Sequence, residues 1–182
     1  GNASFDRAID RVHARLRSAG FPAADLRVEE YAGGGRGWEH AVGTLALVRD
    51  GQPDEIVLSR ETHRVALAIN SFSTPAGGVV APVVDVGRGE TDADYAGKML
   101  KGAVVLGDGP PQRLWQRAVV GGGAIGVVST QIASYITPDS PGAASTPRDQ
   151  WDILQWGSVP YDEARRGFGF KASPRAAATL RR

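Results

Sequence analysis

Two short apolar segments, separated by one helical stretch, constrain the fold of this chain most strongly. Residues 102–106 read GAVVL and residues 124–129 read AIGVVS. Continuous apolar runs of this length are typical of strands that are buried on both faces. Between them, Pro110 and Pro111 can open a helix through Val120, because proline is tolerated in the first helical turn. Strand, helix and strand in this order predict a βαβ unit with two parallel strands.

A helix is predicted at each end of the chain. Apolar residues recur at helical spacing on one face of residues 4–19, and Gly20 can take the left-handed position that follows a helix. Near the C-terminus, Ser173 can cap a helix over residues 174–182 that begins with a proline. Because this closing helix stops after about two turns, we expect it to be cut short.

Further short strands are predicted around the βαβ unit. A turn-rich link joins residues 44–49 to residues 55–59, which predicts a hairpin. Residues 79–86 contain Pro82, which has no N–H to donate to a neighbouring strand and therefore favours an edge position. The remaining predicted strands cover residues 26–31, 153–161 and 168–172. A β-rich middle with one βαβ unit and a helix at either end defines an α+β fold.

A glycine-rich segment divides the chain. Residues 33–37 read GGGRG, a composition that loses much backbone entropy on ordering and is typical of a hinge. We therefore predict a lead-in helix and strand with this hinge over residues 1–37. The β-rich domain follows over residues 38–172, and residues 173–182 begin the closing helix.

Composition and motif content argue against several classes of function. The chain has 21 Lys and Arg residues against 20 Asp and Glu residues, so a general nucleic-acid surface is not indicated. It has no cysteine, and no apolar run approaches the roughly 20 residues that span a bilayer. His13, His40 and His63 form no metal-binding pattern, and no GxSxG motif occurs. We therefore expect this chain to be no enzyme by itself and to bind no cofactor, nucleic acid or membrane.

Two glycine motifs resemble nucleotide-binding sequences in their spacing but do not meet the structural or chemical requirements of such a site. Residues 121–126 have the GxGxxG spacing, but they lead from a predicted helix into a strand, whereas the dinucleotide fingerprint leads from a strand into a helix. Residues 107–109 do lead from a predicted strand into a predicted helix. The next residues, Pro110 and Pro111, however, lack the amide donors that would hold a phosphate. A tight turn between strand and helix is the favoured interpretation.

A long loop supplies the candidate contact residues. Residues 132–149 are rich in Ser, Pro, Ala and Thr, and loops of this length are usually functional lids or disordered segments. Tyr135 and Trp151 offer aromatic packing in and beside this loop, and Arg148 offers a clamp for a carboxylate. We predict these three residues as contacts for a substrate or partner.

Several segments, in order and spacing, resemble one known family. Residues 94–106 (DYAGKMLKGAVVL) match its opening motif, although Ala103 stands where a second lysine is usual. Residues 119–128 (VVGGGAIGVV) are similar to its helix-to-strand segment, and other similar segments are 26–31, 71–87, 156–160 and 168–173. The family is the protease-associated (PA) domain, in the form found in secreted co-catalytic zinc aminopeptidases of the M28-like kind. The likeness extends from about residue 5 to residue 180.

The resemblance implies a small β-rich sandwich or barrel that is not itself catalytic. Such a domain shapes access to a neighbouring active site or contacts peptides and proteins. In that family a separate, following domain carries two zinc ions, their His, Asp and Glu ligands and a Glu general base. The implied partner is therefore the catalytic peptidase domain of the same parent chain, where the zinc is expected. The implied location is secreted or periplasmic.

Two other functions stay open at this point. The chain could be a stand-alone module that binds a peptide or protein through its sheet edge or its long loop. It could also be an enzyme whose site is assembled from unremarkable residues, although no nucleophile, base or metal set is visible in the sequence.

Overall fold

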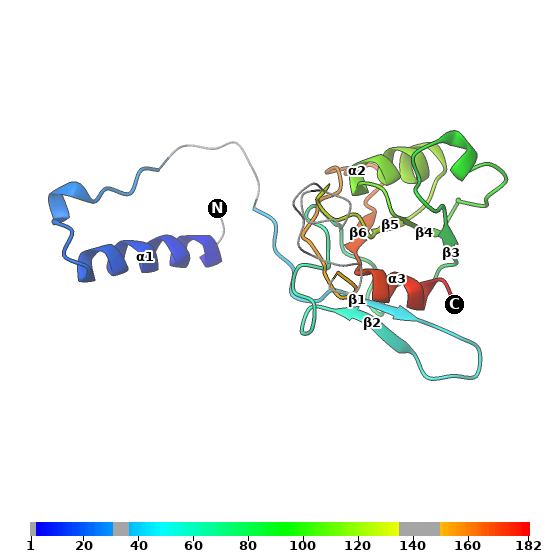
Figure 1. Cartoon of the computed structure of the whole chain (residues 1–182), viewed down its shortest axis with the longest axis horizontal. Coiled ribbons are helices and arrows are strands. Elements are labelled where there is room, and N and C mark those ends of the chain that lie inside the picture. The colour runs from blue at the N-terminus through cyan, green and yellow to red at the C-terminus, as the bar shows by residue number, and fades with distance from the viewer. Residues whose placement is uncertain (1–2, 31–36, 135–149) are drawn as a thin grey trace. The chain divides into compact units, whose positions relative to one another are not determined.

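A computed structural model describes residues 3–30, 37–134 and 150–182 of the chain (Figure 1). The chain divides into two units, Gly1–Ala41 and Val42–Arg182. The boundary predicted at residues 37/38 lies just before this division. Most of the predicted hinge, residues 33–36, lies outside the described residues.

The first unit is built around helix α1, Ala3–Ser18, which confirms the predicted N-terminal helix. Gly20 lies in the turn that follows the helix, and its φ of +94° is the left-handed conformation that favours glycine. A short 3₁₀ turn, η1, follows at Ala23–Asp25. The predicted strand over residues 26–31 is wrong, because residues 26–30 form no strand. A strand needs a neighbour to pair with, and the described part of this unit offers only helix and turn.

The second unit contains a four-stranded parallel sheet in the order β3-β4-β5-β6. All residues of β4 and β5 are buried, which confirms the two predicted central strands. Strand β3 lies at one edge, as predicted for residues 79–86, but it is shorter than predicted and begins directly after Pro82. The strands are β3 (Val83–Asp85), β4 (Val104–Gly107), β5 (Gly126–Ser129) and β6 (Phe168–Lys171).

The connection between β4 and β5 is helical, as predicted, but it is not a regular α-helix. One α-helical turn, α2 (Pro111–Leu114), continues as the π-helical segment η3 (Trp115–Gly121). Trp115, Ala118 and Val119 from η3 form one core cluster together with Val105 and Val127 of the sheet. The βαβ unit therefore covers one face of the sheet with its own crossover.

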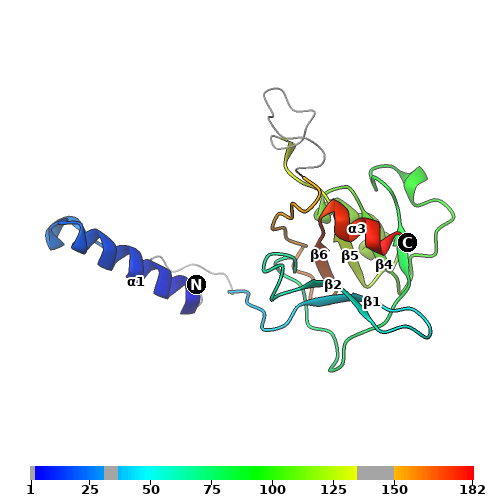
Figure 2. The ribbon, with the colours of Figure 1, turned by 60° about the horizontal axis from the view of Figure 1, so that its bottom comes forward.

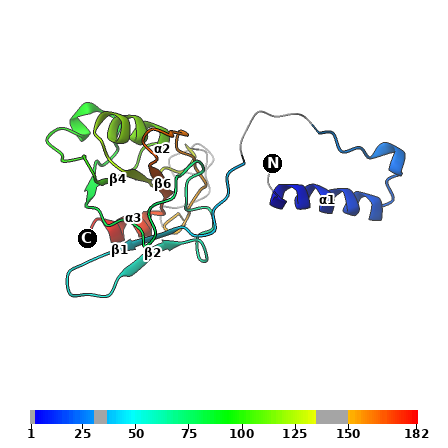
Figure 3. The ribbon, with the colours of Figure 1, turned by 180° about the vertical axis from the view of Figure 1, so that it is seen from behind.

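The opposite face of the sheet is covered by helix α3 and a hairpin (Figure 1 and, from another side, Figure 3). The hairpin confirms the prediction and pairs β1 (Thr44–Leu47) with β2 (Glu55–Ser59) in antiparallel register. In Figure 2, α3 (Pro174–Leu180) lies in front of β4, β5 and β6. The second core cluster joins all of these elements: it includes Leu58, Leu106, Val128, Phe170 and Leu180. This arrangement confirms the α+β fold class.

Helix α3 belongs to the second unit rather than forming a separate closing segment. Ser173 caps the helix as predicted, since its Oγ accepts a hydrogen bond of 3.2 Å from the N–H of Ala176. At the other end, Arg181 donates to Asp85 and Asp108 at 2.9 Å each. Burial alone would raise the pKa of Asp85, but hydrogen bonds from Arg181 and from the Gly87 N–H lower it below its usual value.

Some predicted elements are absent or reduced. The strand predicted over residues 153–161 is wrong, because only Ser158 forms a β-bridge there, with Ile69. Gly157 precedes this residue and Pro160 lies two residues after it, and proline cannot donate to a strand ladder. Within the described residues, no helix is both long and apolar enough to cross a membrane.

The pairing of β5 with β6 requires glycine at position 126. A Cβ there would lie 2.7 Å from the ring of Phe168 and 2.8 Å from the Phe168 carbonyl oxygen. We expect Gly126→Ala to lower the free energy of unfolding by about 1–3 kcal/mol in urea denaturation, because the added methyl overpacks the strand contact.

Gly121→Ala is the matched control. At the end of η3 the nearest atom to an added Cβ is the Gln116 carbonyl oxygen at 3.5 Å, an ordinary contact. This variant should match the wild-type chain or gain up to about 1 kcal/mol, because alanine favours helix over glycine. Equal stability of the two variants would contradict the observed strand register.

Candidate functional site at the carboxyl edge of the parallel sheet

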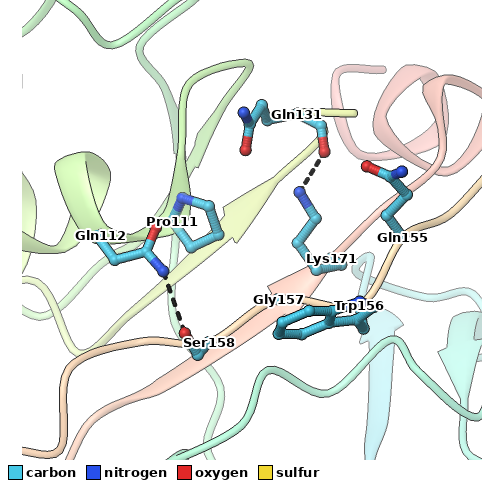
Figure 4. Close-up of a pocket in the computed structure, with 8 residues that line it drawn as sticks. All are labelled: Pro111, Gln112, Gln131, Gln155, Trp156, Gly157, Ser158 and Lys171. Carbon is cyan, nitrogen blue, oxygen red and sulfur yellow. Dashed lines mark hydrogen bonds between the residues drawn. The ribbon is translucent and has the colours of Figure 1, made fainter. Parts of the chain in front are cut away.

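A pocket of about 190 Å³ lies where the parallel strands reach their carboxyl ends (Figure 4). Lys171 comes from the end of β6, and Gln131 follows β5. Pro111 and Gln112 come from the first turn of α2, and residues 155–158 complete the lining. The carboxyl edge of a parallel sheet is where open α/β folds place their ligands.

Lys171 is the central feature of this pocket because its charge is buried. The residue is only 2% exposed. Its Nζ donates to the Ser129 Oγ at 3.2 Å and to the Gln131 carbonyl oxygen, toward which the side chain extends in Figure 4. It forms no ion pair with any carboxylate in the described parts of the chain. A buried ammonium without an anionic partner is costly.

The register of the sheet positions this lysine. Phe168 and Phe170 pack into the core on the α3 side, so alternation along β6 directs Lys171 to the α2 side. Ser129 is its direct partner across the parallel pair, which brings the hydroxyl to the amine. Gly157 lets the chain pass close to the lysine stem: a Cβ there would lie 2.8 Å from the Lys171 Cδ.

Neutral hydrogen-bonding groups and one aromatic ring surround the amine. The Gln112 Nε2 donates to the Ser158 Oγ at 3.1 Å, which joins the first turn of α2 to the opposite wall. The Gln155 Oε1 accepts a hydrogen bond of 2.7 Å from the Ala133 N–H. Trp156 is 66% exposed, so much of its ring is accessible to a ligand.

The electrostatics of the pocket follow from burial. Burial lowers the pKa of Lys171 to about 8, because desolvation disfavours the ammonium. Lys171 is the only ionisable residue among the described residues that line the pocket. An ammonium among neutral polar groups can hold an anion, and a lysine with a lowered pKa can also act as a general base near neutral pH. The pocket is therefore suited to an anionic ligand.

The residues predicted from the sequence as contacts lie elsewhere or cannot be placed. Tyr135 and Arg148 lie outside the described residues. Trp151 is 40% exposed and does not line the pocket. It packs instead against Arg175 at the start of α3, with 5.9 Å between the guanidinium carbon and the ring centroid. Its role as a partner contact stays a prediction.

The two glycine motifs and Asp94 have structural roles here. Residues 121–126 lead from η3 into β5, opposite to a dinucleotide fingerprint, and residues 107–109 form the turn between β4 and α2. Asp94 is part of a capping box, since its Oδ2 accepts from the N–H groups of Glu90 and Thr91 at 2.8 Å each. Among the described residues there is no group of three His, Asp or Glu side chains that could hold a metal.

Sequence reasoning missed Lys171, although the sequence contains a signal for it. The lysine stands in FGFKAS, an otherwise apolar or small-residue strand that is buried at most positions. A lysine in such a strand must either extend to solvent or bury its charge. Whether the Lys171 side chain extends to solvent or is buried depends on its contacts with β5 and with the segment around Gly157.

Comparison of the chain with models of protein families, with curated proteins and with solved structures finds no match.

Replacing the buried charge should stabilise the second unit. The lowered pKa of about 8, against an ordinary value of 10.5, means that the unfolded chain binds more protons between these pH values. Each unit of pKa shift corresponds to about 1.4 kcal/mol, so we expect Lys171→Met to raise the free energy of unfolding at pH 7 by about 3 kcal/mol.

The gain should depend on pH. The native wild-type chain loses its buried charge as pH rises through about 8, so the advantage of Lys171→Met should shrink steadily toward pH 10.5. Urea denaturation of both proteins at several pH values measures this difference. Lys101→Met, at an exposed lysine, serves as the control and should change little. A difference in stability between the two proteins that is the same at every pH would contradict the buried ammonium.

Proposed function

We propose that this chain is a non-catalytic PA-type domain that binds peptide segments and accompanies a zinc-dependent aminopeptidase. In this proposal the catalytic domain of the same parent chain is the partner, and its zinc ions lie in that domain. The parent protein acts outside the cytoplasm, in a secreted or periplasmic location.

The observation that carries the proposal is the chemistry of the pocket at the carboxyl edge. Amide and hydroxyl groups from Gln112, Gln155 and Ser158 match the hydrogen-bonding needs of a peptide backbone. The exposed ring of Trp156 offers an apolar surface for a side chain, and aromatic residues are enriched at binding sites.

A stand-alone peptide-binding module is the second candidate. One observation favours it: every described residue that lines the pocket belongs to the second unit. A peptide that binds to Val42–Arg182 alone with full affinity would support this alternative. A large gain in affinity on joining the catalytic domain would support the accessory role.

Peptide binding is tested by isothermal titration calorimetry with short acetylated peptides. We expect Trp156→Ala to weaken binding about twofold to tenfold, since an aromatic contact contributes about 0.5–1.5 kcal/mol. Trp151→Ala is the matched control, because Trp151 does not line the pocket. If Trp156→Ala leaves the affinity unchanged, peptides do not use this pocket.

The non-catalytic part of the proposal has its own test. The purified chain should release no product from chromogenic amino-acid amides, with or without added zinc, because its described residues include no group of three His, Asp or Glu side chains that could hold a zinc ion. Turnover that is lost on chelation and restored by zinc would overturn the proposal. An active zinc aminopeptidase assayed in parallel confirms that the substrates report correctly.

A further inference from the structure

We propose that the pocket recognises a carboxylate group of the bound peptide through the ammonium of Lys171. This inference rests on the proposed peptide-binding function and adds the chemical group that is recognised. The carboxylate can come from the C-terminus of a peptide or from an Asp or Glu side chain, which present the same planar group to the amine.

The first argument is the open hydrogen-bonding position on Lys171. An ammonium carries three N–H donors. Two of them are used by the Ser129 Oγ and the Gln131 carbonyl oxygen, so one donor has no partner among the described residues. The pocket borders this side chain, which leaves space beside the amine for an acceptor. A charged acceptor satisfies both the open donor and the buried charge.

The second argument is the charge of the site. Lys171 supplies one positive charge, and the other described residues of the lining are neutral. A single ammonium balances a monoanionic carboxylate, whereas a phosphate carries up to two charges and favours arginine or a helix N-terminus. Here the first turn of α2 begins with Pro110 and Pro111, which have no N–H to offer. The site is therefore matched to a carboxylate.

The third argument is that the protein holds this lysine in place. The backbone of Lys171 is paired with Ser129 within the sheet, which fixes the direction in which the lysine side chain leaves β6. Gly157 gives the stem its space, and the Ser158 hydroxyl accepts from Gln112, which leaves the O–H of Ser158 to donate to a ligand. The donor groups are thus preorganised, which lowers the entropy lost on binding.

Carboxylate binding should be linked to protonation of the amine. The free pocket has a lysine pKa of about 8, because its ammonium is desolvated. A bound carboxylate favours the charged form and raises that pKa. The affinity should therefore be nearly constant between about pH 5.5 and pH 7, where the peptide carboxylate is ionised. It should fall up to about tenfold for each pH unit above 8, until the pKa of the complex is reached.

The experiment compares three peptides by calorimetry: Ac-Ala-Ala-Ala with a free C-terminal carboxylate, the same peptide as its C-terminal amide, and Ac-Ala-Glu-Ala-amide. We expect at least tenfold tighter binding of a carboxylate-bearing peptide than of the neutral amide at pH 6.5. A preference for the free acid identifies the C-terminus as the source, and a preference for the glutamate peptide identifies a side chain. The preference should disappear in Lys171→Met and persist in Lys101→Met, which removes an exposed charge instead.

Three outcomes would overturn the inference. Equal binding of all three peptides would refute carboxylate recognition and leave the peptide-binding function standing. An absence of binding by every peptide would refute the proposed function and this inference together. A carboxylate preference that persists in Lys171→Met, or that does not weaken between pH 8 and pH 9.5, would assign the recognition to another residue.

Discussion

Burial of both faces of the four-stranded parallel sheet is the constraint on which the second unit depends. One face packs against the crossover α2 and η3, and the other packs against α3 and the hairpin β1–β2. Parallel strands need such cover on both sides, so the connections between strands must return across the sheet. The same arrangement directs every strand to end at one edge, where Lys171, Gln131 and the start of α2 meet.

The sheet also explains why a charge can persist at that edge. Hydrophobic contacts along β4, β5 and β6 fix the register in which Ser129 lies beside Lys171. A one-residue slip would turn Lys171 into the α3 side of the core and Phe170 toward the pocket. The strands therefore hold the ammonium in a buried position that lowers the stability of the fold. A loss of stability at one residue is common at binding sites.

The parts of the fold that could be predicted from the sequence are those with strong local signals. The apolar runs of the βαβ unit, the helix over residues 4–19 and the capped helix after Ser173 are confirmed by the structure. The predicted strands over 26–31 and 153–161 failed because an extended segment becomes a strand only if a partner is available, which is not a local property. The π-helical path of Trp115–Gly121 also has no simple sequence signal.

The site was harder to predict than the fold because it is assembled from four separate segments. Gln112, Gln131, Trp156 and Lys171 are far apart along the chain and meet only at the carboxyl edge of the sheet. Tyr135, Arg148 and Trp151 are predicted contacts because of their chemistry and their place in or beside a loop. A lysine inside a strand does not meet these criteria. Its importance comes from burial without an anion, which only tertiary structure reveals.

The pKa of Lys171 tests the central claim most directly. The chain has three lysines, so NMR of the labelled Nζ and Cε atoms, with Lys→Arg variants for assignment, can follow each titration separately. Lys171 should titrate near pH 8, well below the ordinary lysine value of 10.5. Titration of Lys171 near the ordinary value of 10.5 would mean that its amine is solvated or paired, and would contradict the account of the pocket.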